Sequence, residues 1–411
     1  MVEMSIPHLF RCPISLDLFI DPVTLCTGQT YDRCSIQKWL EDGNLTCPVT
    51  MQPLHDTTLV PNHTLRHLIE QWVLKGPDPN HQLKQPSPGR NSVPTNDMEW
   101  SLTTLKCLLQ SESATSDAKI EVLKKVRNLS IESDVGRACL IQLGFFPLLL
   151  ELIFQSPTAF LLCNQELLEL SLDCLLTLSP SSHLDSLDKV LTKDPNFASL
   201  VLFLGKGNAK IKISLCYLLE TIAMSESIEA LTIKIGQSPC VMQSLVSILD
   251  TKTDLLVSDA CVRAINGLCH PMVNRENAIK EGAMHSLVKY LLNTSTTKNA
   301  SPKALAALDC LLELEIGKKN IAKLRDNNLI KVLVKHIFVV SSENEGSEYA
   351  ASILLTMCRD SSWARGKAAH AGVVTQLLFL IQSQCNSRAK TKARALLMLL
   401  RSKFRRCDQK M

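Results

Sequence analysis

Four cysteines and four histidines are the side chains of residues 1–75 that could do chemistry. They are Cys12, Cys26, Cys34, Cys47, His8, His55, His63 and His67. A domain built on two zinc ions needs eight Cys or His ligands, arranged largely in pairs two residues apart. No cysteine pair has that spacing, and Cys12 and Cys47 are instead each followed three residues later by a hydroxyl, Ser15 and Thr50. The segment has the layout of a metal-binding domain without ligands at the required spacing, so we expect no bound metal and no other cofactor.

A catalytic role for the same cysteines is the next hypothesis. A reactive thiol needs a basic and partly exposed setting, and only Cys34, next to Arg33, comes near one. No sequence pattern pairs a nucleophile with a base or sets two carboxylates together. We therefore expect structural cysteines and no catalytic residue.

The composition predicts the elements that carry these residues. The chain has 411 residues, of which 45% are hydrophobic and only 5% aromatic, which favours stacked helices over a sandwich or barrel. Most of the 16 cysteines lie in apolar helical patterns, as buried reduced thiols do in cytoplasmic or nuclear proteins. The chain shows no basic and apolar leader and no run long enough for a transmembrane segment. We expect a soluble cytoplasmic protein that also enters the nucleus.

Three regions follow one another along the chain. Residues 5–75 are compact and rich in turn residues, and residues 97–411 read as one helix after another. Between them, residues 76–96 hold five prolines and two glycines and almost nothing apolar, which predicts a flexible linker. The two flanking regions should therefore fold separately.

The helical region repeats. Helix boundaries recur at Gly144, Gly236, Gly282, Asn328 and Gly372, with separations of 92, 46, 46 and 44 residues. The period near 46 is typical of armadillo and HEAT repeats, and the region has room for six to seven of them. Gly and Asn tolerate the left-handed turn that joins two helices, so we expect such a turn at each marker. Residues 155–210 lack a marker, which indicates a repeat with inserted loops.

The first region carries a more specific pattern in the segments "RCPIS", "DPVTLCTGQTYDRCSIQKWL", "CPVTMQPL" and "LVPNHTLRHLIEQW". In this order and spacing they resemble the U-box, the metal-free relative of the RING domain. Followed by a linker and armadillo repeats, the chain resembles the shorter members of the plant U-box and armadillo-repeat ubiquitin ligase family. The resemblance implies a small α+β U-box and then an all-α armadillo solenoid. It also implies a function in stress or defence signalling.

The resemblance implies roles for named residues. Polar side chains should tie the U-box loops in place of zinc, at Ser15, Asp21, Asp32, Arg33, Thr50 and Asn62. A ubiquitin-charged conjugating enzyme should dock on Ile14, Leu16, Trp39 and Pro48, and no residue of this chain should act as nucleophile. Related ligases carry a cation where this sequence has Met51, so the charge-assisted hydrogen bond that favours transfer is absent here. The U-box could also form a homodimer.

The repeats should bind a protein substrate in the groove that stacked helices form. The groove residues that we expect are Asn128, Asn266, Lys392, Arg394 and Arg401, of which the last three could attract an acidic partner. The segment 387–411 holds nine Lys or Arg and one acid, Asp408, and the simpler interpretation of this charge is a solvated helix face. We expect no nucleic-acid partner.

Three alternatives stay open at this point. The chain could be an adaptor that binds a target through its repeats while its U-box no longer promotes transfer, which Met51 favours. It could be a zinc-binding RING-like protein that loses its fold with a chelator. It could be a nucleic-acid or cargo-binding armadillo protein, whose binding would depend steeply on salt.

Overall fold

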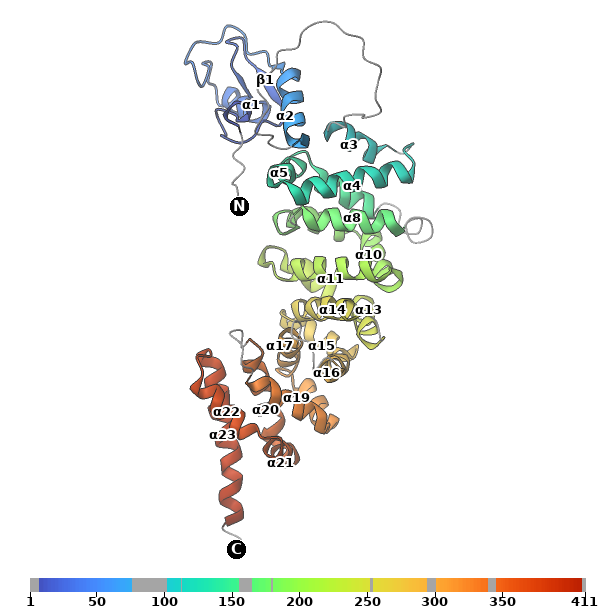
Figure 1. Ribbon diagram of the computed structural model, residues 1–411, viewed down its shortest axis with the longest axis vertical. Coiled ribbons are helices and arrows are strands. Elements are labelled where there is room, and N and C mark those ends of the chain that lie inside the picture. Colours follow the sequence, from blue (N-terminus) through green and yellow to red (C-terminus); the bar gives the residue numbers. More distant parts are fainter. Residues whose placement is uncertain are drawn as a thin grey trace. The chain divides into compact units, whose positions relative to one another are not determined.

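The computed structural model describes residues 7–75, 102–111, 113–154, 165–178, 180–251, 254–293, 301–338 and 345–408 (Figure 1). The chain divides into two compact units, Met1–Ser179 and Pro180–Met411. The predicted linker at residues 76–96 lies outside the described residues. Each unit is described here by itself.

The segment 7–75 forms a small α+β fold around a three-stranded antiparallel sheet of strand order β2-β1-β3. The elements are η1 (His8–Phe10), β1 (Pro22–Thr24), β2 (Thr30–Asp32), α1 (Arg33–Glu41), β3 (Val60–Pro61) and α2 (His63–Lys75). Val23 of the central strand pairs with Tyr31 on one side and Pro61 on the other. Val23, Tyr31 and Ile36 are fully buried, so a core lies between the sheet and α1.

The rest of the first unit is helical. Its helices are α3 (Leu102–Gln110), α4 (Ser116–Glu132), α5 (Asp134–Gln142), α6 (Phe145–Phe154) and α8 (Gln165–Thr177). Thr115 and Ser133 cap α4 and α5, because each side chain accepts a hydrogen bond from a first-turn amide. Phe145 and Phe146 of α6 are fully buried. The aromatic-poor composition thus still places its few rings in the core.

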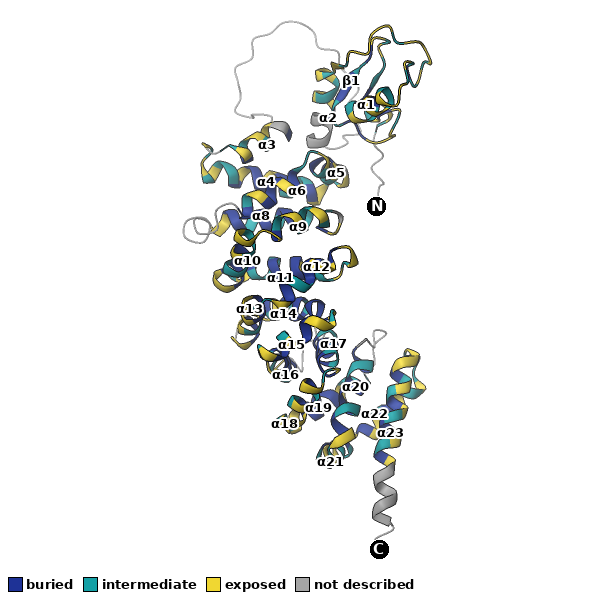
Figure 2. Ribbon diagram, turned by 180° about the vertical axis from the view of Figure 1, so that it is seen from behind, coloured by how far each residue is buried: buried dark blue, intermediate teal, exposed yellow. Residues whose placement is uncertain are grey.

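The second unit consists of helices in groups of three, in each of which a short helix is followed by two that carry most of the core. The elements are η2 (Pro180–Ser182), α9 (Leu184–Leu191), α10 (Asp194–Lys206), α11 (Ala209–Ala223), η3 (Glu226–Ile228), α12 (Glu229–Gln237), α13 (Pro239–Asp250), α14 (Leu255–Leu268), α15 (Met272–Lys280), α16 (Ala283–Asn293), α17 (Ser301–Leu311), α18 (Glu315–Leu324), α19 (Asn327–Ile337), α20 (Glu345–Asp360), α21 (Ser362–His370), α22 (Val373–Gln382) and α23 (Ser387–Asp408). Figure 2 shows that the buried residues lie where these helices face one another. The predicted all-helical repeat architecture is confirmed.

The marker residues behave in two ways. Gly144, Gly282 and Gly372 have the expected left-handed backbone, with φ of 76°, 89° and 82°. The expectation is wrong at Gly236, which lies inside α12, and at Asn328, which lies inside the first turn of α19. In the latter repeat the left-handed residue is Arg325, at the end of α18, with φ of 36°. The period therefore marks the repeats correctly, although not every marker is a turn.

Gly236 is needed for packing instead of for backbone conformation. A Cβ atom at this position would lie 2.2 Å from Nδ2 of Asn274 in α15. That amide is fully buried and donates to the carbonyls of Thr232 and Leu268, at 3.1 and 2.9 Å. The contact joins α12 to α15, the first helices of two successive repeats.

Arg275 makes a second internal tie. It is largely buried, and its guanidinium donates to the carbonyls of Cys269 and His270 and pairs with Glu313 at 2.5 Å. The described cysteines form no disulfide. Among the described residues, no single helix is long and apolar enough to cross a membrane, although the bent pair Gly136–Gln142 and Phe145–Phe154 meets both criteria together.

Candidate functional site

The two loops that carry Cys12 and Cys47 adopt the same turn. In each loop the amide four residues after the cysteine donates to the cysteine carbonyl, from Leu16 and from Met51, both at 2.8 Å. The cysteine amide in turn donates to the carbonyl of the next residue along, Asp17 at 2.7 Å or Gln52 at 2.9 Å. The sequences "CPISL" and "CPVTM" therefore build one motif twice.

Both turns end in a residue with left-handed backbone that is not glycine. The φ angle is 62° at Leu16 and 58° at Met51. An L-residue in this region costs about 1 kcal/mol because its Cβ crowds the following carbonyl. In return, the side chains at both positions project outward, with exposed fractions of 67% and 68%.

The two sulfur atoms accept hydrogen bonds where a zinc domain would use them as ligands. Both cysteines are fully buried. The amide of Asp32 donates to Sγ of Cys12 at 3.2 Å, and the hydroxyl of Thr27 donates to Sγ of Cys47 at 3.3 Å. Within the described residues, no three His, Cys, Asp or Glu side chains come together as a set of metal ligands.

Tyr31 holds the second loop. Its hydroxyl lies 3.0 Å from Sγ of Cys47 and accepts a hydrogen bond from the amide of Val49 at 3.1 Å. Burial and the contact with the Cys47 sulfur raise the pKa of Tyr31 well above its ordinary value, so it stays protonated and can donate. Burial by itself raises the pKa of the Cys47 thiol, but the hydroxyls near its sulfur, first that of Thr27 and then those of Thr50 and Tyr31, outweigh it and lower the pKa to about 6.

A carboxylate ties the first loop. Asp32 is buried, and its Oδ2 accepts hydrogen bonds from the amides of Ile20 and Asp21 at 2.7 and 3.1 Å. Its Oδ1 accepts from the amide of Cys34 at 3.3 Å, which makes Asp32 the cap of α1 as well. One side chain thus joins the loop, the end of β2 and the helix.

An ion pair and an amide complete these contacts. Asp21 pairs with Arg33 at 2.6 Å and lies 3.7 Å from the guanidinium of Arg66. Nδ2 of Asn62 donates to the hydroxyl of Thr30 at 3.2 Å, and its Oδ1 caps α2 by accepting from the amide of Leu65 at 3.0 Å. Asp21, Arg33 and Asn62 therefore each join segments that are distant in the sequence.

The two predicted hydroxyls have a more local environment than we expected. Ser15 is exposed and accepts only a long hydrogen bond, 3.4 Å, from the amide of Asp17 in its own turn. Thr50 lies beside the sulfur of Cys47, but its hydroxyl has no partner of normal hydrogen-bond geometry among the described residues. In the second loop the ties come instead from Tyr31 and Thr27, which the sequence interpretation missed.

The predicted docking residues lie on the two loops and on α1. Ile14, Trp39 and Pro48 are half-buried, and Leu16 is exposed. The indole of Trp39 is not free, because its Nε1 donates to the carbonyl of Thr46 at 2.9 Å and holds the ring against the second loop. The equivalence of the two turns adds Val49, which corresponds to Ile14 and has an exposed fraction of 51%.

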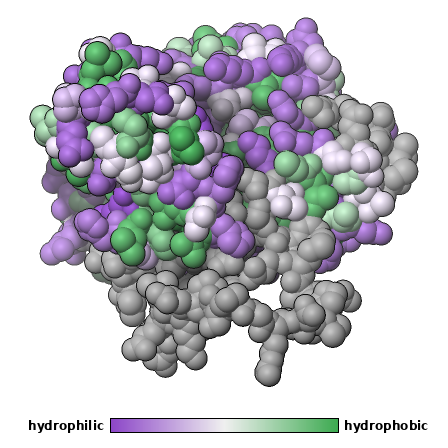
Figure 3. Space-filling model, turned by 90° about the horizontal axis from the view of Figure 1, so that it is seen from above, coloured by the Kyte–Doolittle hydropathy of each residue, from purple (hydrophilic) through white to green (hydrophobic). Residues whose placement is uncertain are grey.

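We call Ile14, Leu16, Trp39, Pro48, Val49 and Met51 the docking surface. It is apolar and carries no charged side chain of its own. On the face that Figure 3 shows, hydrophobic side chains form small groups among hydrophilic ones. Leu16, Val49 and Met51 expose large apolar side chains, and such side chains, where they adjoin, are typical of a surface that a partner covers.

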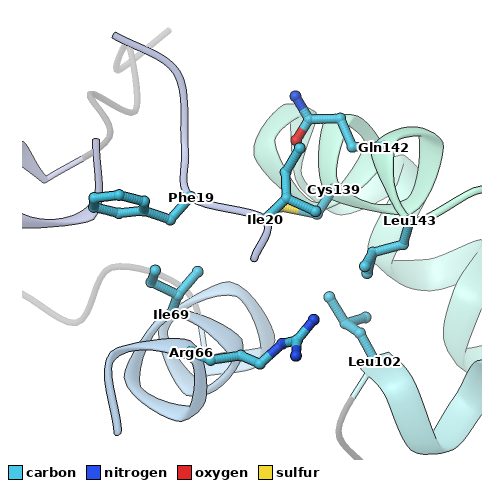
Figure 4. A pocket seen from close by; sticks show the side chains of 8 residues that line it. All are labelled: Phe19, Ile20, Arg66, Ile69, Leu102, Cys139, Gln142 and Leu143. Atoms are coloured by element: carbon cyan, nitrogen blue, oxygen red, sulfur yellow. The ribbon is translucent and has the colours of Figure 1, made fainter. Parts of the chain in front are cut away.

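A small cavity lies elsewhere in the first unit. It is lined by Phe19, Ile20, Arg66, Ile69, Leu102, Cys139, Gln142 and Leu143 (Figure 4). Its volume is about 30 Å³, which suffices for a water molecule and not for an organic ligand. It does not extend the docking surface.

The repeats do not present the predicted groove residues as one set. Asn128 is exposed on α4, as expected, but Asn266 is a correction, because it is only 6% exposed in α14 and its Oδ1 has no hydrogen-bond partner among the described residues. The α14 helix packs closely on α11 at this level, since Gly267 would place a Cβ atom 2.8 Å from that of Ala223. The close packing accounts for the burial of the Asn266 side chain.

The predicted basic residues of α23 lie on more than one face. Arg394 and Arg401 are exposed, whereas Lys392 is partly covered. Lys392 also lies close enough to Asp309 of α17 to oppose the rise in the pKa of that carboxyl, which burial causes. Two residues along a helix are separated by about 200° around the axis, so Lys392 and Arg394 cannot act as neighbours.

Comparisons with known proteins agree with this geometry. Residues 6–76 match the family model described as U-box domain, and residues 104–410 match the model described as plant U-box protein ARM repeat region. The U-box domain-containing protein 25 of Arabidopsis thaliana is 32% identical over 413 residues, which covers 98% of this chain and 92% of the relative. The E3 ubiquitin-protein ligase PUB23 of the same plant is 28% identical, with 97% and 93% covered.

Solved structures support the fold alone. A chain from a structural study of the interaction between cadherin and β-catenin matches with a TM-score of 0.56 and 17% identity, over 72% of this chain and 55% of that one. An engineered protein matches with a TM-score of 0.54 and 21% identity, over 72% and 68%. With family models matched over nearly the whole sequence, the chain belongs to the plant U-box proteins that carry armadillo repeats.

Proposed function

We propose that this protein is a U-box ubiquitin-protein ligase, which binds a ubiquitin-charged conjugating enzyme on the docking surface and promotes transfer to a lysine of a substrate. The substrate is bound by the armadillo repeats. The observation that supports the proposal most directly is the pair of equivalent turns that carry Ile14, Leu16, Val49 and Met51, the second of which Trp39 contacts through its indole. Two relatives that span nearly the whole chain are named as ligases, PUB22 and PUB23.

The chemistry of such a ligase requires no nucleophile on this chain. The thioester carries the activated carboxyl, and the ligase contributes by holding it in a productive geometry. The Cys47 thiol, whose pKa is lowered, is fully buried and occupied by hydrogen bonds, so it is unsuited to accept ubiquitin. Cys26 and Cys34 are exposed, and neither lines the cavity next to Phe19 and Ile20.

An autoubiquitination assay with ubiquitin, activating enzyme, ATP and a panel of conjugating enzymes tests the proposal. Trp39→Ala and Leu16→Ala should each lower the rate at least about tenfold, as the loss of anchors at the centre of an interface does. The matched control is Leu256→Ala in α14, because Leu256 is 63% exposed and lies outside the docking surface. Undiminished activity in both U-box variants would rule out this docking surface.

The second candidate is a non-enzymatic adaptor, and the exposed thioether of Met51 favours it. The position cannot supply the charge-assisted hydrogen bond that a cation would make to ubiquitin. A wild-type chain that binds conjugating enzymes on a sensor surface, yet forms no ubiquitin chains with any of them, would establish the adaptor.

A further inference from the structure

The α11 helix carries an open hollow that the docking surface does not use. It is lined by Pro180, Ser181, Leu184, Tyr217, Glu220, Thr221, Met224 and Ser225 and has a volume of about 570 Å³. All of these residues belong to the second unit. The hollow opens widely to solvent, so a protruding part of a larger partner could enter it.

The walls of the hollow are apolar where they are most exposed. Met224 is 61% exposed and Tyr217 is 40% exposed, and they lie seven residues apart, which places them on one face of α11 about two turns from each other. The hydroxyl of Tyr217 makes no hydrogen bond to the described part of the chain. Both side chains are therefore available to a partner.

Glu220 gives the hollow its charge. It is the only charged residue of the lining, and it forms no ion pair with any described residue. It lies between Tyr217 and Met224 along the helix, within one turn of each. An anionic group beside two apolar side chains selects a partner that joins an apolar side chain to a positive charge.

The same level of the neighbouring helices carries short polar side chains. Thr221, Asn266 and Asp309 each lie two residues before the end of α11, α14 and α17. Asn266 has its Oδ1 buried and unpartnered among the described residues, and burial raises the pKa of Asp309. Asn266 is buried and Lys392 lies near Asp309, and neither Asn266 nor Asp309 belongs to the lining of the hollow.

We propose that this hollow, which we call the α11 hollow, binds a protein segment that carries a large apolar residue next to Lys or Arg. The apolar side chain packs between Tyr217 and Met224, and the cation pairs with Glu220. The inference rests on the proposed function, because such a segment is the part of a substrate that the repeats would recognise. A preference for a cationic segment is the opposite of the preference for an acidic partner that the basic residues of α23 suggest.

The test is selection from a displayed library of short random peptides on the full chain, followed by fluorescence anisotropy with the peptides obtained. Peptides that join Phe, Leu or Met to Lys or Arg should be enriched. Glu220→Lys should weaken their binding about tenfold, because a salt bridge becomes a like-charge contact. Glu229→Lys, the same change at an exposed acid of α12 outside the hollow, should leave the affinity unchanged.

A charge exchange makes the test specific. A peptide whose cation is replaced by Glu should lose affinity for the wild-type chain and regain it with Glu220→Lys. No enrichment, enrichment of acidic peptides, or equal binding by the Glu220 and Glu229 variants would overturn the proposal. So would a dimer of the chain that Met224→Ser dissociates, since a second copy would then occupy the hollow.

The proposed ligase function is judged separately. Autoubiquitination by the wild-type chain does not require a substrate in the hollow, so peptide selection can fail while ubiquitin transfer is present. The reverse result, selective peptide binding without transfer, would support the α11 hollow and refute the ligase.

Discussion

Replacement of Tyr31 by Phe removes one hydroxyl and nothing else from the U-box core. The ring is fully buried, so its packing is retained. The amide of Val49 loses its acceptor at 3.1 Å, and the sulfur of Cys47 loses a donor at 3.0 Å. A polar group left without a partner in a protected site costs about 1 to 3 kcal/mol. We therefore expect the second loop to open more often, while the sheet and the helices remain.

Hydrogen exchange of the full chain measures how often the second loop, residues 45–54, opens. The expected cost corresponds to faster exchange in residues 45–54, by a factor between about 5 and about 140, since about 1.4 kcal/mol is tenfold. The matched control is Tyr217→Phe, because the Tyr217 hydroxyl makes no hydrogen bond within the described residues. If exchange in residues 45–54 were the same in both variants, the tie through Tyr31 would be refuted.

Three further predictions concern single positions. Met51→Arg should raise the rate of ubiquitin discharge from the conjugating enzyme by up to about tenfold, because the arginine adds a charge-assisted hydrogen-bond donor. Single-turnover gels measure the discharge rate, and Met51→Leu is the control. Gly236→Ala should lower the free energy of unfolding of the second unit by about 1 to 3 kcal/mol, because the added Cβ atom clashes with Asn274; thermal melts measure it. The control is Gly205→Ala, where a Cβ atom meets nothing within 4 Å, and it should be neutral or stabilising. The pKa of Cys47 is lowered from 9.0 to about 6, so the thiolate stabilises the fold fully above pH 9, and this contribution is lost as the pH falls through about 6. Protection of residues 45–54 from hydrogen exchange, corrected for the intrinsic rate, should therefore rise from about pH 6 to pH 9. The Cys47→Ser variant should show no such rise.

Local patterns predicted the architecture well because they express backbone requirements directly. The period of 46 residues and the glycines at Gly144, Gly282 and Gly372 reflect the turn between two helices, which few residues tolerate. Gly236 shares the spacing but answers a different requirement, space for Asn274. A glycine in the sequence does not reveal which of the two applies.

The candidate site was harder to predict where long-range geometry decides a role. Asp32 was predicted from the U-box resemblance as a residue that ties the loops, and the structure shows that it caps α1 as well. Tyr31 was missed, because in sequence it is an ordinary strand residue, and its partner Cys47 lies 16 residues away. The repetition of "CP" followed by a β-branched residue and a hydroxyl was a signal that could have added Val49. The burial of Asn266 depends on how closely two helices approach, which no local pattern contains.

The left-handed backbone at Leu16 and Met51 has a consequence for the engineering of a more thermostable variant of this protein. Glycine at either site would relieve the backbone and raise the melting temperature, so stability screens would favour it. The same exchange would delete a side chain that is about two-thirds exposed and that, under the proposed function, contacts the conjugating enzyme. If the proposed function holds, stability of the fold and binding of the conjugating enzyme are therefore opposed at these two positions.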